Sequence, residues 1–335
     1  MPIVCEKIPS GEWSRKSEYV GIEEFSWVNE TLRPNIPLAS KWSMRPCFLS
    51  AKYERSAEIV ENFQVYPDDT WLVSFPKCGT TWTQELVWQL CNFDLATESP
   101  LRSRFPFLEL GCITYDAFKL DMISILQKKS PPRFIKTHLP AHLLPKQIWS
   151  VKPKIVYVTR NVKDAAVSYY HHYKNLQHYK ASFEDFMDAF LTDKVVHAPY
   201  DSHVVDFWNM RNEENILFLT FEDMKRDHPS VIRKTAEFLG KSFTDEQIET
   251  LAEHLSFDKM IKNDAVNYRK EVNQYHQICN TKKDDDFNFI RKGQIGTYRQ
   301  EMSAEMIERF DKWIEERLTK CKADPQVFEI CNPKN

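Results

Sequence analysis

The stretch Phe75-Pro76-Lys77-Cys78-Gly79-Thr80-Thr81-Trp82 decides how this chain folds and what it can bind. The apolar run 71–75 leads into it, and apolar residues at helical spacing lead out of it. This pattern predicts a strand, a tight loop and a helix, in which free backbone N–H groups at the helix start face an anion. Because Lys77 adds a cation and two threonines add hydroxyls, we interpret the loop as a phosphate or sulfate site.

The order of residues in this loop separates it from a Walker A loop. A Walker A loop reads G-x-x-x-x-G-K-[ST], with the lysine directly after the second glycine. Here Lys77 comes two residues before Gly79, and the chain has only seven glycines. Three of the seven, Gly79, Gly293 and Gly296, fall in segments that we expect to approach phosphate, where glycine permits close contact and positive φ.

The composition is that of an ordinary soluble protein, and the length allows one large α/β domain or two smaller ones. The chain has 335 residues, 42% hydrophobic and 28% charged, with a formal net charge of −3. The charge excludes a bulk basic field for nucleic acid or an anionic membrane, although a local patch could still bind an anion. No apolar run reaches the ~18 residues needed to cross a bilayer. The N-terminal residues lack the pattern of a secretory signal, so we expect a cytoplasmic protein.

Eight scattered cysteines form no C-x-x-C pair and no dense framework, so we expect free thiols. Cys78 is the exception because it lies in the anion loop at a helix start, an environment that lowers a thiol pKa. The alternative interpretation is a small residue that fills a tight loop, and we favour it.

Strand-like and helix-like segments alternate along the chain. Strands are expected at 71–75, 133–136, 154–159 and 215–221. Helices are expected at 54–63, at 229–238 and at 303–318, and Gly240 ends the second of these. Two more are expected to begin at Asn161, with Asp164 three residues on as a capping-box-like pair, and at Thr244, with Gln247 three residues on. Alternation of this kind predicts an α/β fold, a parallel β-sheet flanked by helices, with ligands at the carboxyl ends of the strands.

Unusual polar residues follow three of these strands. One strand ends at Lys77, the second at Lys136-Thr137-His138, and the third at Arg160, with Ser168 eight residues further on the following helix. If the three strands are neighbours, these side chains form a concave anion site. Lys136 and His138 point to the same face because they are two residues apart in extended chain.

His138 is the candidate general base. A neutral imidazole beside two lysines resists protonation and could take a proton from a hydroxyl. Lys77 and Lys136 could neutralise charge on a departing oxygen. A lone histidine before a proline is more often structural, but its position in Lys-Thr-His-Leu-Pro after an anion loop favours the catalytic interpretation.

Weaker candidates lie elsewhere. Arg160 suits phosphate oxygens, and Arg291-Lys292-Gly293 is a second basic cluster. The alternatives are a surface arginine and a solvated charge run. Trp82 could stack on a base or serve as a core aromatic, and periodicity does not separate the two. No metal-ligand motif occurs in the sequence, which favours transfer of a less charged group than phosphoryl, such as sulfuryl.

These motifs resemble those of the cytosolic sulfotransferases. Residues 75–82 resemble the family's 5′-phosphosulfate loop, 136–140 match its catalytic histidine segment, and 159–170 resemble its 3′-phosphate segment. Residues 221–225 and 291–296 resemble later blocks, so that the motifs follow in family order over about 70–318. The N-terminal ~45 residues are longer than in many mammalian members and resemble the extensions of insect members, including the retinol-dehydrating type. The chain as a whole is similar to these insect proteins and to phenol sulfotransferases.

The resemblance implies a P-loop-NTPase-like sulfotransferase fold and the donor 3′-phosphoadenosine-5′-phosphosulfate (PAPS), without a metal. Its acceptor would be a small phenol, steroid or retinoid-like alcohol, and transfer would be direct and in line. The implied catalytic residues are His138, Lys77 and Lys136. The implied nucleotide-binding residues are Lys77, Cys78, Gly79, Thr80, Thr81, Trp82, Arg160, Ser168, Phe221, Leu255, Ser256, Phe257, Met260, Arg291, Lys292 and Gly293.

The sequence departs from the family at several points. Cys78 replaces a serine, Phe221 a tyrosine and Leu255 a threonine. The family's dimer signature is eroded, which leaves a homodimer open. We expect one domain over 1–335, with 1–50 laid over the core and 256–290 as a loop that gates substrate and cofactor. Aromatic and histidine residues at 169–173 are candidates for the acceptor pocket.

Two other classes remain. A metal-dependent nucleotide kinase of the P-loop type is disfavoured by the reversed Lys–Gly order. A non-catalytic carrier of hydrophobic ligands is disfavoured by the presence of Lys77, Lys136, His138 and Ser168 together.

Overall fold

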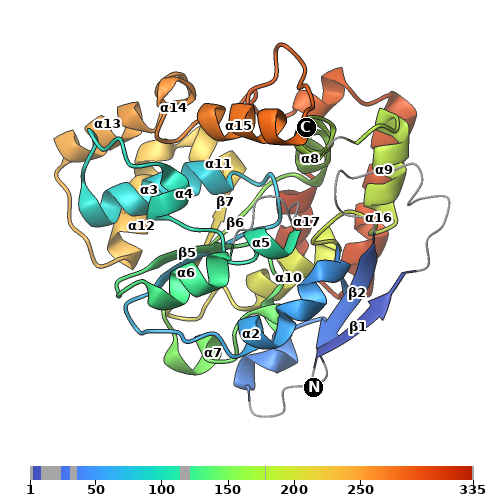
Figure 1. Ribbon diagram of the computed structural model, residues 1–335, viewed down its shortest axis with the longest axis horizontal. Helices are drawn as coiled ribbons and strands as arrows, with labels where there is room; N and C mark the ends of the chain where they lie inside the picture. The colour runs from blue at the N-terminus through green and yellow to red at the C-terminus, as the bar shows by residue number, and fades with distance from the viewer. Residues whose placement is uncertain (1–2, 9–23, 31–35, 114–120, 178, 334–335) are drawn as a thin grey trace.

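A computed structural model of the chain describes residues 3–8, 24–30, 36–113, 121–177 and 179–333 (Figure 1). At its centre lies a four-stranded parallel sheet in the order β5-β4-β6-β7. Its strands are β4 (Thr70–Val73), β5 (Phe134–Thr137), β6 (Lys154–Thr159) and β7 (Ile216–Thr220). The predicted strands and the α/β class are confirmed.

The register of this sheet brings the three polar strand ends together. Val73 at the end of β4 pairs with Thr137 of β5 on one side and with Tyr157 of β6 on the other. The strands that lead to Lys77, Lys136 and Arg160 are therefore direct neighbours, and their carboxyl ends lie at one edge.

Successive side chains of each strand serve opposite faces of the sheet. Leu72 packs with α3 (Thr80–Asn92), α12 (His228–Phe238) and α13 (Asp245–His254). Trp71 and Val73 pack in the other cluster. That cluster contains α8 (Val162–Leu176), α10 (Tyr200–Asn209) and α16 (Ala304–Lys320). The two layers of helices lie on either side of the sheet in Figure 1.

Shorter helices complete the described chain. The α-helices are α2 (Ala57–Glu61), α4 (Leu101–Arg104), α5 (Leu110–Ile113), α6 (Met122–Lys128), α7 (Ile148–Val151), α9 (Phe183–Leu191), α11 (Phe221–Arg226), α14 (Phe257–Lys262), α15 (Arg269–Cys279) and α17 (Pro325–Cys331). The 3₁₀ turns are η1 (Pro37–Lys41), η2 (Ala51–Arg55), η4 (Ala141–Leu143) and η5 (Thr297–Gln300).

Local sequence signals set several helix ends as predicted. Thr244 and Gln247 form a reciprocal capping box at the start of α13. Ser303 caps α16 through the backbone N–H of Met306. Gly240 follows α12 with φ of +68°, the left-handed conformation that glycine adopts at a helix end.

The N-terminal segment forms a second sheet that the sequence analysis missed. Strands β1 (Ile3–Lys7), β2 (Phe25–Glu30) and β3 (Cys47–Ser50) pair antiparallel in the order β1-β2-β3. Phe25 and Phe48 of this sheet are buried in the main core. The backbone of β3 is also hydrogen-bonded to the segment that precedes α10. Phe48 N–H donates to Ala198 O and His197 N–H donates to Phe48 O, both at 2.8 Å.

The segment 256–290 is not the plain loop that we expected. It contains α14 and α15, which together cover 257–262 and 269–279. Apolar residues such as Met260 and Val272 are buried, and this burial stabilises helices that the polar composition of the segment conceals. In Figure 1 α15 lies across the top of the molecule, close to α8.

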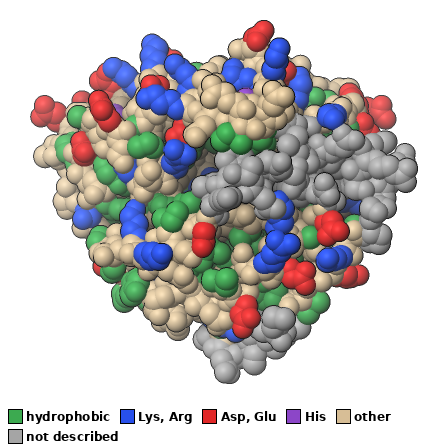
Figure 2. All heavy atoms as spheres, viewed as in Figure 1, with side chains coloured by type: hydrophobic (Ala, Val, Ile, Leu, Met, Phe, Trp, Pro, Cys, Tyr) green, Lys and Arg blue, Asp and Glu red, His purple; other side chains and the backbone are tan. Residues whose placement is uncertain are grey.

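Charges of both signs are interspersed over the face drawn in Figure 2. This distribution agrees with the net charge of −3. Among the described residues, no helix combines the length and the apolar character needed to cross a bilayer.

Candidate active site

The loop between β4 and α3 takes the conformation of an anion-binding turn. Lys77 and Gly79 have φ of +67° and +96°, and α3 begins at Thr80. A Cβ at Gly79 would lie 2.9 Å from the Phe221 ring, so both the backbone and the packing require glycine. The loop therefore presents the amino end of a 13-residue helix to the space above the sheet.

That space is a cavity of about 620 Å³. All but two of the sixteen residues expected at the nucleotide, and all three expected catalytic residues, line it. They are Lys77, Gly79, Thr80, Thr81, Trp82, Lys136, His138, Arg160, Ser168, Phe221, Leu255, Phe257, Met260, Arg291, Lys292 and Gly293. Cys78 and Ser256 do not line it. Residues from six separate segments thus meet around one volume.

His138 is fixed by hydrogen bonds at two points. Its Nδ1 lies 2.6 Å from the carbonyl oxygen of Ser74, and its backbone N–H donates to Glu109 Oε1 at 2.6 Å. Because a carbonyl only accepts, Nδ1 carries the ring hydrogen and Nε2 has a free lone pair. Burial, with the charge of Lys136 and the neighbouring His197, holds the pKa of His138 well below its usual value. The ring is therefore a neutral base at physiological pH.

The two lysines of the site are half-buried and have no carboxylate partner among the described residues. Burial lowers the pKa of Lys77 to about 7, helped by repulsion from Lys136, Arg291 and Arg160. Burial also lowers the pKa of Lys136 to about 8, against the attraction of Glu109. Neither ammonium group takes part in a salt bridge among the described residues. A group of cations that repel each other in a cavity fits a polyanionic ligand.

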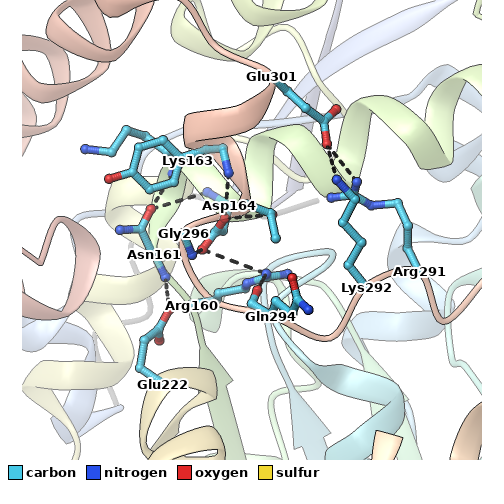
Figure 3. Close-up of polar contacts among 12 residues, drawn as sticks. Arg160, Asn161, Lys163, Asp164, Glu222, Arg291, Lys292, Gln294, Gly296 and Glu301 are labelled. Carbon is cyan, nitrogen blue, oxygen red and sulfur yellow. Dashed lines mark hydrogen bonds and ion pairs between the residues drawn. The ribbon is translucent and has the colours of Figure 1, made fainter. Parts of the chain in front are cut away.

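Arg160 stands at the end of β6 with donors to spare. One of its Nη2 hydrogens goes to the carbonyl of Gln294 at 2.7 Å (Figure 3). The guanidinium lies over the Phe221 ring at 4.3 Å. Its Nε is buried and has no hydrogen-bond partner in the described part of the chain. An unused, buried fork donor of this kind suits a phosphate.

Asp164 ties the later basic loop to the start of α8. Its carboxylate accepts from Gly296 N–H at 2.6 Å, the Thr297 hydroxyl at 3.0 Å and Tyr298 N–H at 3.1 Å. Only half of the expected capping box forms. The Asn161 side chain caps the start of α8, but the Asp164 side chain does not accept from the Asn161 backbone N–H. The N–H of Asn161 donates to Glu222 instead (Figure 3).

The cluster Arg291-Lys292-Gly293 lies at the rim of the cavity. Gly293 has φ of +58°, and a Cβ there would lie 2.5 Å from the Phe257 ring. Arg291 Nη1 donates to Glu301 Oε1 at 2.8 Å, and Lys292 Nζ donates to the same oxygen at 3.3 Å (Figure 3). Glu301 was missed from the sequence, although it is only ten residues from Arg291.

Trp82 combines the two roles that periodicity could not separate. Its ring packs at 5.6 Å from Phe221 and 4.7 Å from His228, yet it lines the cavity. Phe257 and Met260 of α14 line the same region. These apolar groups form a wall suited to a flat base.

Cys78 is a buried structural thiol. Burial raises its pKa far above the ordinary value, more than the nearby Arg160 lowers it. The environment at the helix start that we expected to lower this pKa is therefore overridden by desolvation. The interpretation as a small residue that fills the loop is the one that the structure favours.

The remaining cavity wall includes two histidines, of which the sequence analysis predicted one. Of residues 169–173, Tyr169 and His172 line the cavity, whereas His171 turns to Glu301 at 2.6 Å. His197, which we did not single out, also lines it. It is 1% exposed, and neither ring nitrogen has a hydrogen-bond partner among the described residues. Its position depends on pairing with β3, which no local pattern reveals.

Comparison with known proteins agrees with this geometry. The model of the sulfotransferase domain family matches residues 67–322. The chain belongs to the sulfotransferase family. The luciferin sulfotransferase of Photinus pyralis is 40% identical over 290 residues, which cover 81% of this chain and 77% of that protein. Mouse sulfotransferase 1A1 is 33% identical over 276 residues, covering 80% and 91%.

Solved structures place this sulfotransferase beside retinol dehydratase. One solved structure holds retinol dehydratase with retinol and PAP, the product of PAPS. That protein is 30% identical to this chain, the match covers 95% of this chain and 97% of the other, and the TM-score is 0.80. The complex of retinol dehydratase with androsterone and PAP gives 0.81. The protein is a PAPS-dependent sulfotransferase, and the cations around its cavity fit that donor.

Proposed function

We propose that this sulfotransferase moves the sulfuryl group of PAPS directly to the hydroxyl of a small lipophilic phenol or alcohol, with His138 as the base. The observation that carries the proposal is the free Nε2 of His138, which faces the same cavity as Lys77 and Lys136. The three residues come from the adjacent ends of β5 and β4. A base next to cations is what deprotonation of a hydroxyl beside an anionic donor requires.

The nucleotide is assigned to the cavity from its chemistry. The backbone of 78–81, the threonine hydroxyls and Lys77 bind the 5′-phosphosulfate. Trp82, Phe221, Leu255 and Met260 enclose the adenine. Arg160, Ser168 and the cluster 291–293 bind the 3′-phosphate, with Phe257 beside it and Ser256 behind that wall, at the start of α14. The unused Nε of Arg160 supports this assignment.

The transfer is one step. The acceptor oxygen forms a bond to sulfur as the bond between sulfur and the phosphate oxygen of the departing PAP breaks. The acceptor proton passes to Nε2 of His138, while Nδ1–H stays on the Ser74 carbonyl. The new charge on PAP is met by protonated Lys77, and Lys136 supports the sulfuryl oxygens from the other side. No covalent enzyme intermediate is needed.

The acceptor end of the cavity is largely apolar. Its walls include Phe107, Leu110, Ile113, Val272, Tyr275, Ile278 and Phe289. A wall of this kind suits flat or elongated lipophilic molecules. Solved complexes of retinol dehydratase hold androsterone and retinol, so steroids and retinoids belong in the acceptor panel.

The proposal covers the rest of the chain as well. Residues 1–335 act as one domain in the cytoplasm, with 1–50 as an extension on the core and 256–290 as the segment that gates the cavity. α15 supports gating because Val272, Tyr275 and Ile278 line the cavity on one face of that helix. A homodimer is tested by sedimentation of the purified protein.

The decisive experiment incubates the protein with labelled PAPS and a panel of phenols, catecholamines, steroids and retinol, and identifies each product by mass. We expect a gain of one sulfuryl group on at least one acceptor, with the rate unchanged by excess EDTA. A product without sulfate but with water lost identifies dehydration after transfer. No transfer from PAPS, together with a Mg²⁺-dependent gain of a phosphoryl group from ATP, favours a kinase, and binding of acceptor without any turnover favours a carrier.

A further inference from the structure

The carboxylate of Glu301 lies among the cations of the candidate 3′-phosphate site. Oε1 of Glu301 accepts from Arg291 at 2.8 Å and from Lys292 at 3.3 Å, and Oε2 accepts from His171 of α8 at 2.6 Å. Figure 3 shows the Glu301 carboxylate pointing at both basic side chains. The side chains of Arg291 and Glu301 are only 17% and 20% exposed, so solvent screens this contact less than a surface ion pair.

This carboxylate is charged under all ordinary conditions. Burial opposes ionisation, but the hydrogen bond and charge of His171, together with Arg291, hold the pKa of Glu301 at about 2. Arg291 at the same time lines the cavity, and its charge helps to lower the pKa of Lys77. A permanent anion therefore sits where a second anion, the 3′-phosphate, is expected to bind.

The two oxygens of Glu301 have different partners. Oε1 bonds the basic pair at the cavity rim, whereas Oε2 bonds α8. If a phosphate takes over the donors of Arg291 and Lys292, the carboxylate keeps His171 as its partner. Gln300 also holds Lys292, at 3.2 Å, so the lysine stays near the rim during such an exchange.

We propose that Glu301 is an internal counter-anion that competes with the 3′-phosphate of the nucleotide for Arg291 and Lys292. The proposal rests on the proposed function, which assigns those two residues to the 3′-phosphate. The competition weakens binding of PAPS and PAP alike. It keeps the basic pair in position in the free protein and lets the product PAP leave faster, because affinity differences of this kind appear mainly in the dissociation rate.

The test measures binding of two nucleotides that differ only at the 3′ position, PAP and 5′-AMP, by calorimetry. The variant Glu301→Gln keeps the size of the side chain and an oxygen acceptor but removes the charge. Replacing one negative charge several ångströms from a doubly charged phosphate should tighten PAP binding about tenfold. The dissociation constant of 5′-AMP should change less than twofold.

Glu305→Gln is the matched control. Glu305 lies four residues on, in the first turn of α16, is exposed, and forms no ion pair in the part of the chain that the structure describes. It makes the same change in net charge, and we expect it to leave both dissociation constants within twofold. Equal tightening in both variants would assign the effect to overall charge and overturn the proposal.

Unchanged or weaker PAP binding in Glu301→Gln would also overturn the role of Glu301. The proposed function would still stand in that case if the wild-type protein prefers PAP to 5′-AMP. If the wild-type protein itself bound the two nucleotides equally, the 3′-phosphate assignment would fail first. Should Glu301→Gln not fold, Glu301→Asp withdraws the carboxylate from Arg291 by about 1.5 Å. It should then tighten PAP binding severalfold, and no tightening there counts against the proposal.

Discussion

Nδ1 of His138 lies 2.6 Å from the carbonyl oxygen of Ser74, the residue that directly follows strand β4. The candidate base on the end of β5 is therefore oriented by the end of the strand that leads into the anion loop. The hydroxyl of Ser74 lies 2.8 Å from that of Thr80, the first residue of α3. Base orientation and anion binding thus depend on one short stretch of chain.

Removal of the base should separate chemistry from binding. His138→Ala should lower kcat by about a thousandfold, because a positioned general base contributes roughly 10²–10⁴. Its Nε2 is not assigned to the nucleotide, so the dissociation constant of PAP should stay within about twofold. Calorimetry and a steady-state assay on the same preparation check both. Retained turnover would remove His138 from its role.

Nucleotide binding should take up protons above neutral pH. The free protein holds Lys77 with a pKa of about 7 and Lys136 with a pKa of about 8, so both lysines are largely deprotonated at pH 8.5. A bound polyanion favours the charged forms and raises both pKa values. PAP affinity should therefore fall as pH rises from 7 to 9. Calorimetry at pH 8 in buffers of different ionisation enthalpy measures the uptake.

Lys77→Met is the control for that measurement. It removes one of the two titrating groups, so proton uptake at pH 8 should fall, and PAP affinity should vary less with pH. The same proton uptake in wild type and variant would contradict the assignment to Lys77.

The buried His197 should favour acceptors that carry two adjacent hydroxyl groups. Its ring centroid lies 5.4 Å from that of His138, and its Nε2 lies 3.4 Å from Glu109 Oε1. That contact lacks hydrogen-bond geometry, but the negative charge favours the hydrogen on Nε2 and leaves Nδ1 as an acceptor in the wall that His138 also lines. We expect His197→Phe to lower kcat/KM for 2,3-dihydroxynaphthalene about tenfold, the loss of one hydrogen bond in a buried site.

The matched substrates are 2-naphthol and 3-methoxy-2-naphthol, which offer one hydroxyl each. Their kcat/KM values should change less than threefold in His197→Phe. An equal loss for all three acceptors would mean that the variant disturbs the cavity in general, contrary to the expected preference.

Gly293 should tolerate no side chain, for two separable reasons. At φ of +58° an alanine costs about 1–2 kcal/mol of backbone strain, and its Cβ would also lie 2.5 Å from the Phe257 ring. Gly240 has φ of +68° with nothing within 4 Å of the added Cβ. Gly240→Ala should lower only the free energy of unfolding, by that strain. Gly293→Ala should lose PAP affinity as well, measured by calorimetry beside denaturant unfolding.

The sequence predicted those parts of the fold that local pattern and spacing determine. Short apolar runs identified all four central strands, and the residues Thr244, Gln247 and Ser303 marked helix starts by their own side-chain bonds. The shared edge of the sheet followed because parallel neighbours expose the same ends. These features depend on residues within a few positions of each other.

What the sequence could not show depends on distant pairs. Strands β1, β2 and β3 are short and separated by long connections, so their pairing leaves no local periodicity. His197 reaches the cavity only because its backbone pairs with Phe48, about 150 positions earlier. Asp164 had an obvious local role as a capping residue, but three donors from 296–298 take its carboxylate. Tertiary contacts outweighed the local preference in each case.

The hydrogen bonds between Phe48 and the segment at His197 link substrate choice to the far end of the polypeptide. A change in the small antiparallel sheet could shift that imidazole by a fraction of an ångström while the nucleotide half stays untouched. Relatives that share the donor could therefore diversify in what they sulfate through their amino-terminal residues, and grafting these residues between such enzymes offers a route to redirect them.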